Sequence, residues 1–97
     1  MSNKVFEFEW DAEKAKLNER RHGIRFEEAE TAFDDPYARV GYDPDHSVTE
    51  HRLILIGHSY RHRLLFVCFT EREGHIRIIS ARKATRKERK GYEEREK

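Results

Sequence analysis

The sequence predicts an α+β fold, in which an antiparallel sheet carries two N-terminal helices on one face and a basic helix follows at the C-terminus. Three apolar segments between residues 52 and 82, separated by short polar stretches, predict consecutive strands. Two amphipathic segments before residue 36 predict the first two helices. A chain of 97 residues has room for one small core, so we expect residues 1–97 to form a single domain.

The composition is highly charged, but its apolar residues are concentrated. Charged residues make up 40% and hydrophobic residues 36%, yet 15 of the 29 residues from Leu53 to Ala81 are apolar. The longest apolar run, LLFVCF, is far shorter than the roughly 20 residues of a membrane-spanning helix. Cys68 is the single cysteine, and no apolar run near the start resembles a signal peptide, so we expect a reducing cytoplasm.

The first elements expected are an edge strand and a helix. Residues 5–10, VFEFEW, alternate apolar and acidic side chains, which is typical of a half-buried strand. Asp11 is a favourable N-cap for a helix that continues to Arg21. Gly23 stands where a left-handed C-cap is expected.

A second helix should follow directly. Phe26, Ala29 and Phe33 recur at helical spacing. Pro36 ends this helix, because proline disfavours helical backbone at the residue before it. A short extended segment is expected over residues 37–42.

The three apolar segments, residues 52–59, 63–70 and 75–82, are rich in β-branched and aromatic residues. Polar turns of hairpin length at residues 60–62 and 71–74 join them, which predicts an antiparallel meander. Their near-continuous apolar character places them in the middle of the sheet, covered at least in part on both faces.

The last helix has a charge pattern that its own stability does not favour. Thr85 and Glu88 fit a capping box at its start. Six basic residues lie between Arg82 and Lys90, at the positive end of the helix dipole, and Gly91 interrupts the middle. We interpret this helix as a surface for anions or for an acidic partner. The alternative is a frayed, solvated tail.

The charge is divided unevenly along the chain. Residues 1–51 hold seven Lys and Arg and thirteen Asp and Glu, whereas residues 52–97 hold thirteen and six, although the net charge is only +1. Such an asymmetry predicts an anionic partner for the second half, and nucleic acid is the obvious one. The alternative is that the charges merely solvate a small domain.

The sequence gives little support for a metal site or for a nucleophilic cysteine. His58 and His62 are four residues apart but flank a predicted turn, and no Cys, Asp or Glu cluster completes a metal site with them. Cys68 falls in the most apolar strand, where a buried, inert thiol is expected. We therefore expect no metal and no cofactor.

The residues instead suit phosphodiester cleavage of RNA without a metal. This reaction needs a base for the 2′-hydroxyl, cations for the phosphorus oxygens and an acid for the leaving 5′-oxygen. Arg77 is the leading phosphate contact, because a charged residue between isoleucines must be paired or line a groove. Strand alternation predicts Arg77 on one face and Arg82 on the other. An equally weighted alternative pairs Arg77 with Glu7 or Glu9.

Histidine suits the two proton transfers because its pKa lies near neutrality. His22 follows the first predicted helix, and His46 lies in the DPDHS loop between two acids and a serine. Loops held by a rigid sheet often carry catalytic groups. Both histidines are also compatible with ordinary surface positions.

The chain resembles the BrnT family of type II toxin–antitoxin toxins. The likeness runs from about Phe6 to Glu93 and rests on EWD, RHG with FEEA, DPDH, and RIISARKAT followed by ER and YE. These markers are specific in combination, although each alone is weak. Where the family often has a glycine or small residue in a turn, this chain has His62.

This resemblance implies a RelE-like fold and a ribonuclease that cleaves cellular RNA to halt translation and growth. It also implies an antitoxin partner, BrnA, whose ribbon-helix-helix domain binds the operon's DNA, so that DNA is contacted only indirectly. The wider group uses side chains and no metal. Among the positions that match the family's motifs, the resemblance implies an active groove formed by His22, His46, Arg77 and Arg82. It also implies candidate RNA contacts at Arg63, Lys83 and Tyr92.

Two other function classes fit the same basic half. One is a non-catalytic nucleic-acid-binding module, and the other is a protein-interaction domain that docks an acidic partner on its C-terminal helix. The nuclease hypothesis requires guanidinium groups that face a polyanion. It fails if Arg77 and Arg82 are both buried against acidic side chains with no cationic hollow nearby.

Overall fold

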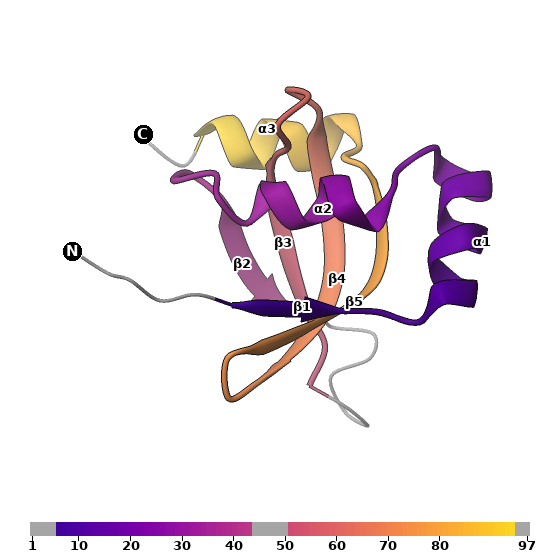
Figure 1. The fold of residues 1–97 in the computed structure, drawn as a ribbon. Coiled ribbons are helices and arrows are strands. Elements are labelled where there is room, and N and C mark those ends of the chain that lie inside the picture. Colours follow the sequence, from indigo (N-terminus) through magenta and orange to yellow (C-terminus); the bar gives the residue numbers. More distant parts are fainter. Residues whose placement is uncertain (1–5, 44–50, 95–97) are drawn as a thin grey trace.

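The computed structural model describes residues 6–43 and 51–94, which form a five-stranded sheet between helices (Figure 1). All the elements expected from the sequence are present, within a few residues of the expected bounds. In chain order they are β1 (Glu7–Glu9), α1 (Ala12–His22), α2 (Phe26–Ala32), β2 (Arg39–Tyr42), β3 (Leu53–His58), β4 (Leu64–Arg72), β5 (His75–Lys83) and α3 (Arg86–Glu94).

The sheet has the order β1-β5-β4-β3-β2 and is mixed rather than antiparallel. The predicted meander of β3, β4 and β5 is confirmed, and β2 extends it antiparallel to β3. The prediction of a wholly antiparallel sheet is wrong at one edge, where β1 pairs parallel to β5. No hairpin joins these two strands, so no local turn signal fixes their relative direction.

The caps of α1 are those that the sequence predicts. The Asp11 carboxylate accepts hydrogen bonds from the backbone N–H groups of Glu13 and Lys14, at 2.8 and 3.1 Å. Gly23 closes the helix with a φ of 69°, a conformation that costs glycine little. The side chain of Asn18, which is buried, then ties this helix to the edge of β5.

Asn18 extends the hydrogen-bond ladder of the sheet beyond the short β1. Its amide accepts from the backbone N–H of Ala81 at 3.0 Å and donates to the Ala81 carbonyl oxygen at 2.8 Å. It also donates to the carbonyl oxygen of Ile24 at 3.0 Å. One side chain therefore satisfies the N–H and C=O groups of Ala81, which lies beyond the pairing of β1 with β5.

The core lies between α2 and the facing side of the sheet. Ile24 and Phe26 are fully buried against Leu65, Val67 and Ile78 of β4 and β5. Edge-to-face ring contacts extend this core toward β1: Phe8 with Phe33, Phe33 with Phe69, and Trp10 with Phe26. The alternating apolar residues of the first strand thus face inward, as predicted.

The two faces of the sheet are covered by different helices (Figure 1). Adjacent residues of β3 show this directly. A Cβ atom placed on Gly57 would lie 2.8 Å from the backbone oxygen of Ala32 in α2, whereas the ring of His58 contacts Tyr92 of α3. We call the side that bears His58 the α3 face.

The turn between β3 and β4 has a left-handed residue at His62, whose φ is 64°. Glycine tolerates this conformation better than other residues, so a histidine at this position introduces backbone strain. The turn is nevertheless closed by hydrogen bonds between Ser59 and Arg63, at 2.9 Å, and between Ser59 and His62, at 2.8 Å.

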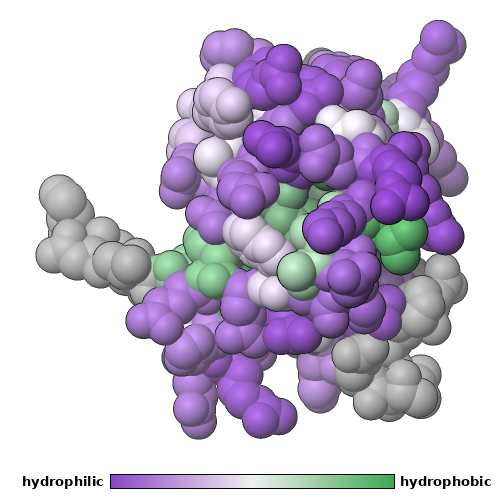
Figure 2. Space-filling model, turned by 45° about the vertical axis from the view of Figure 1, so that its right-hand side comes forward, coloured by the Kyte–Doolittle hydropathy of each residue, from purple (hydrophilic) through white to green (hydrophobic). Residues whose placement is uncertain are grey.

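Hydrophilic residues cover most of the side of the molecule on which α1 lies, with hydrophobic residues confined to small areas (Figure 2). Among the described residues, no helix combines the length and apolar character needed to cross a membrane.

Candidate functional site

The sequence-predicted arginines of β5 both lie on the α3 face, because the strand contains a β-bulge. Ladder pairs join Cys68 to Ser80 and Phe69 to Ile78, so Ile79 is an extra residue between them. Strict alternation would place Arg77 and Arg82 on opposite faces, and that prediction is wrong. The bulge shifts the alternation by one residue.

Burial confirms this placement. Ile76, Ile78 and Ala81, which all belong to the core, are almost completely buried. Arg77 lies between two of these residues and Arg82 directly follows the third, so both arginines point away from the core. The two arginines are five positions apart in the chain, which corresponds to roughly 15 Å along a strand.

Arg82 is held by three different groups. Its guanidinium donates to both carboxylate oxygens of Glu88, at 2.9 and 3.0 Å, and to the carbonyl oxygen of Lys83 at 3.1 Å. It also lies over the ring of Phe66, 4.0 Å from the ring centre. The side chain of Arg82 is 34% exposed and is therefore accessible at the surface.

Glu88 combines a capping role with its ion pair. It accepts from the backbone N–H of Thr85 at 2.9 Å, and the Thr85 hydroxyl accepts from the backbone N–H of Glu88 at 3.2 Å, so the predicted capping box is confirmed. Burial raises the pKa of the Glu88 carboxyl, but the hydrogen bonds from Arg82 and Thr85 outweigh it and hold the pKa below its ordinary value. Glu88 is therefore a carboxylate at neutral pH.

Arg77 makes the salt bridge that the sequence offered as the alternative. Its guanidinium lies 3.2 Å from the Glu9 carboxylate, and both side chains are 52% exposed. Exposed pairs of this kind contribute little stability, about 0–1 kcal/mol. A phosphate can therefore compete with Glu9 for Arg77 at little cost.

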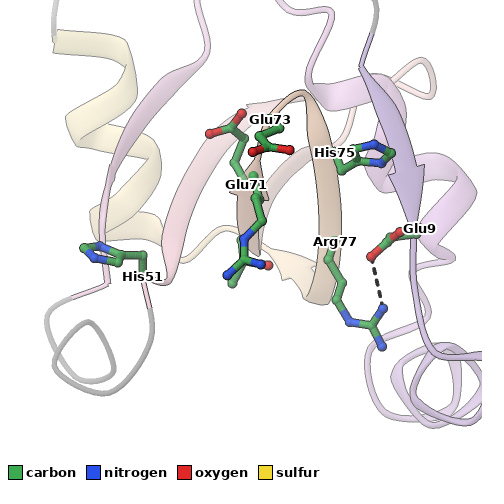
Figure 3. A pocket seen from close by; sticks show the side chains of 8 residues that line it. Glu9, His51, Glu71, Glu73, His75 and Arg77 are labelled. Carbon is green, nitrogen blue, oxygen red and sulfur yellow. Dashed lines mark hydrogen bonds and ion pairs between the residues drawn. The ribbon is translucent and has the colours of Figure 1, made fainter.

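A hollow of about 720 Å³ surrounds Arg77 at the end of the sheet remote from α3 (Figure 3). Figure 3 shows Glu71 and Glu73 on the β4–β5 hairpin and His75 and Arg77 beside β1. The lining brings together cationic, titratable and acidic side chains, namely Arg72, Arg77, His51, His75, Glu9, Glu71 and Glu73. Its charges nearly balance, so this hollow is not strongly cationic.

A second hollow, which we call the α3 groove, lies between α3 and the strands β2, β3 and β4 and has a volume of about 570 Å³. Ile54, Ile56 and Phe66 line it from the sheet, and the bases Arg39 and Lys87 lie at its sides. Glu88 is the one acid among its lining residues in the described part of the chain, and Arg82 already binds it. The α3 groove is thus the more cationic of the two hollows.

A hydrogen-bonded cluster fixes α3 at the other side of the groove. The Tyr92 hydroxyl donates to Asp35 at 2.6 Å and lies 3.2 Å from Nδ1 of His58. Asp35 also accepts from the backbone N–H groups of His58 and Tyr37, at 2.8 and 2.9 Å. Burial raises the pKa of Asp35, but these hydrogen bonds outweigh it and leave the pKa below its ordinary value.

His58 is a residue whose chemistry the sequence did not reveal. Its ring is partly exposed, and a hydroxyl and a carboxylate orient its Nδ1 side. The sequence identified Asp35 only as the end of a helix, and it considered His58 only for a metal site with His62. No local pattern predicts that α3 brings Tyr92 to both.

Two predicted RNA contacts, Arg63 and Tyr92, serve the fold. Arg63 binds the buried Glu28 through its Nε atom, at 2.9 Å, and through a second hydrogen bond from its terminal nitrogen. The hydrogen bond from Arg63, helped by one from Ser59, holds the pKa of Glu28 below its ordinary value despite burial. Tyr92 is only 7% exposed, which leaves little of it to contact RNA.

The other predicted site residues lie apart from the two arginines. Lys83 is exposed at the end of β5, and its ladder partner is the core residue Leu65, so it lies on the opposite face from Arg82. His22 is exposed at the last residue of α1, and among the described residues no interaction joins it to Arg77 or Arg82. His46 lies outside the described residues.

Only part of the arrangement that would contradict the nuclease hypothesis is present in the structure. Arg77 and Arg82 both pair with acidic side chains, but neither is buried. A cationic hollow, the α3 groove, adjoins Arg82 through Phe66 and Glu88. The arrangement offers guanidinium groups and a titratable histidine on one sheet face, which suits binding and cleavage of a phosphodiester.

Comparisons with known proteins point to a family. A family model described as "Ribonuclease toxin, BrnT, of type II toxin-antitoxin system" matches residues 10–88. The crystal structure of the Brucella abortus ribonuclease toxin BrnT, at 1.1 Å resolution, superposes with a TM-score of 0.66 at 24% identity, over 84% of this chain and 100% of that one. At that identity the likeness concerns the fold. A search of curated proteins found no match.

Proposed function

We propose that this chain, which belongs to the BrnT family of ribonuclease toxins of type II toxin–antitoxin systems, cleaves RNA on the α3 face of its sheet without a metal ion. Membership of the family implies an RNA target and an antitoxin partner. The proposed location of the cleavage site is supported by the bulge of β5, which brings Arg77 and Arg82, both partly exposed, to the same face of the sheet.

Arg82 is the proposed contact to the scissile phosphate. A guanidinium has five N–H donors, and three of those of Arg82 serve Glu88 and Lys83. Two donors remain for phosphate oxygens, on a group that the ion pair and the Phe66 ring already hold in place. A preorganised cation of this kind stabilises the charge that develops in the transition state. Arg77 is proposed to bind a phosphate farther along the RNA on the same face, and Lys83, on the opposite face, a phosphate of RNA that passes the end of β5.

Histidine is proposed to transfer the protons. His22 and His46 remain the candidates that the family motifs give, and we add His58 because Tyr92 and Asp35 orient its ring beside the α3 groove. Attack of the 2′-hydroxyl on the phosphorus would leave a 2′,3′-cyclic phosphate on one product and a 5′-hydroxyl on the other. Arg63 and Tyr92 are proposed to act indirectly, through the turn and the helix that they fix.

The antitoxin is proposed to be of the BrnA type, with a ribbon-helix-helix domain that binds DNA. The toxin itself would then contact DNA only indirectly, and both proteins would act in the cytoplasm. We also propose that the fold is of the RelE-like kind and that residues 1–97 form one domain. The hydrophobic core, which draws on residues from α2 and from strands β3, β4 and β5, supports the single domain.

Cleavage of labelled single-stranded RNA in the presence of EDTA tests the proposal. The full chain is expected to give 2′,3′-cyclic phosphate products, and Arg82→Ala is expected to lower the rate by about 10²–10³-fold. Arg25→Ala is a matched control, because Arg25 is an exposed arginine paired with Glu19 in another part of the molecule. Salt-sensitive RNA binding without products would instead identify a non-catalytic module.

A second test uses growth. Expression of the chain is expected to halt growth, and both Arg82→Ala and co-expression of a ribbon-helix-helix partner are expected to restore it. RNA that stays intact with and without EDTA, from a chain that still arrests growth, would contradict the nuclease assignment.

A further inference from the structure

We propose that the α3 groove is a binding subsite for one unpaired nucleotide of the RNA, with the base on an apolar floor and its phosphate at the basic side chains. This inference rests on the proposed function and deepens it. It assigns the substrate class as single-stranded RNA and names the residues that would select it.

The shape and composition of the groove support this assignment. Its floor consists of Ile54, Ile56 and Phe66, which strand alternation places together on the α3 face. A base that has left its stack has a flat apolar surface that such a floor can cover. The volume of about 570 Å³ falls within the range of small-ligand sites, about 300–1,000 Å³.

The charges at the sides of the groove favour a nucleotide over a purely apolar group. Arg39 and Lys87 approach from β2 and α3, and the acid Glu88 is neutralised by Arg82. An apolar side chain of a protein would need the floor but not the two cations. A nucleotide uses both, because it carries an anionic phosphate beside an apolar ring.

Gly41 keeps the groove open at its β2 side. Its ladder partner is Ile54, so a side chain at this position would point to the α3 face. A Cβ atom placed on Gly41 meets no atom of the described residues within 4 Å, and its φ is not positive. A larger residue can therefore enter the groove here without forcing the backbone to move.

The groove also lies beside Arg82, the proposed contact to the scissile phosphate. Phe66, part of its floor, lies beneath the guanidinium of Arg82, and Glu88, at its wall, holds that guanidinium. A base in the groove would therefore place an adjoining phosphate near Arg82. Paired bases of a duplex could not enter, which would restrict the enzyme to unpaired RNA.

The decisive experiment fills the groove and leaves the rest of the chain unchanged. Gly41→Phe is compared with Leu17→Phe, because Leu17 is 48% exposed on α1 and does not line the groove. The probe is a fluorescent single-stranded RNA ten-mer with 2′-O-methyl groups, which binds but cannot be cleaved. Gly41→Phe is expected to weaken binding about tenfold, and Leu17→Phe to leave it within about twofold.

A charge-reversal pair covers the case in which Gly41→Phe does not fold. Lys87→Glu should weaken binding of the same probe and reduce the dependence of binding on salt, whereas Lys90→Glu should do so less, because Lys90 does not line the groove. A ten-mer hairpin that presents only paired bases should bind more weakly than the single strand, and Gly41→Phe should not weaken it further.

The outcomes separate this inference from the proposed function. If the chain cleaves RNA but Gly41→Phe and the control variant bind the probe equally well, the proposed subsite is wrong and the nuclease assignment stands. If Gly41→Phe loses only its affinity for the antitoxin, the groove holds a protein and the subsite is also wrong. If the unaltered chain neither binds nor cleaves single-stranded RNA, both proposals fail.

Discussion

The guanidinium of Arg82 and the carboxylate of Glu88 form a two-point ion pair, with donor–acceptor distances of 2.9 and 3.0 Å, that joins the end of β5 to the first turn of α3. The same carboxylate closes the capping box of α3. One acidic side chain thus fixes both the start of the basic helix and the orientation of the proposed phosphate-binding arginine.

Glu88→Ala should therefore lower both stability and activity. Loss of the cap and of the ion pair is expected to reduce the free energy of unfolding by about 1–2 kcal/mol. Because Arg82 would lose its orientation but keep its charge, we expect kcat for RNA cleavage to fall more than KM rises. Steady-state kinetics and urea denaturation measure the two effects, with Glu93→Ala in the same helix as the control. An unchanged kcat would show that Glu88 does not position Arg82.

Acid should destabilise the protein through its paired carboxylates. Hydrogen bonds hold the pKa values of Glu28, Asp35 and Glu88 below their ordinary values in the folded state. A lowered folded-state pKa means that the unfolded chain binds protons more readily, so the stability from these groups is present above about pH 4 and is lost as the pH falls through the folded pKa values. Glu30 acts in the opposite direction, because burial raises its pKa.

The Glu28–Arg63 pair allows this pH dependence to be measured. Glu28→Gln should lower the free energy of unfolding by about 2–3 kcal/mol at pH 7 and by less at pH 3, because below its ordinary pKa the Glu28 carboxyl is protonated in the unfolded chain and its ionisation stabilises the fold less. Glu19→Gln, which alters an exposed pair with Arg25, should change little at either pH. Equal losses for Glu28→Gln at both pH values would contradict the assigned cause.

Asn18→Ala should be strongly destabilising, although it removes only a small polar side chain. The substitution removes three hydrogen bonds and leaves the N–H and C=O groups of Ala81 without partners in a buried position. We expect a loss of about 2–4 kcal/mol in the free energy of unfolding. Denaturation in urea measures it, and Lys16→Ala on the exposed side of α1 serves as control. A loss below about 1 kcal/mol would mean that water replaces the amide at this edge.

Two glycines in neighbouring strands should respond oppositely to alanine. At Gly57 the added Cβ would approach the backbone oxygen of Ala32 to 2.8 Å, so α2 and β3 must move apart, at a cost of about 1–3 kcal/mol. At Gly41 the space is open, and alanine should be neutral or slightly stabilising. Thermal unfolding of the two variants compares them directly. Similar midpoints would refute the close contact.

His62→Gly should stabilise the β3–β4 turn, because His62 holds a φ of 64°. Glycine adopts this conformation without the clash that a Cβ atom introduces, and relief of that strain is worth up to about 1 kcal/mol. The gain is measured as a higher unfolding midpoint in urea. His51→Gly, at a position before β3 without a left-handed backbone, is the control and should give no such gain.

The sequence by itself determined the elements of this protein. Asp11 and Gly23 set the ends of α1, Thr85 and Glu88 set the start of α3, and the apolar segments set the meander, because these signals act between residues that are close in the chain. The family motifs also lie within the sequence, and they identified the BrnT family before any fold was known.

The tertiary structure alone decided how the site is assembled. The parallel pairing of β1, the bulge at Ile79 and the meeting of Tyr92 with Asp35 and His58 each depend on contacts between segments far apart in the chain. A bulge of one residue reverses the face of every side chain beyond it, so alternation read from the sequence misplaced Arg82 relative to Arg77. Pairing between distant charges is equally invisible to local patterns, which is why Arg63 proved to hold Glu28 inside the fold.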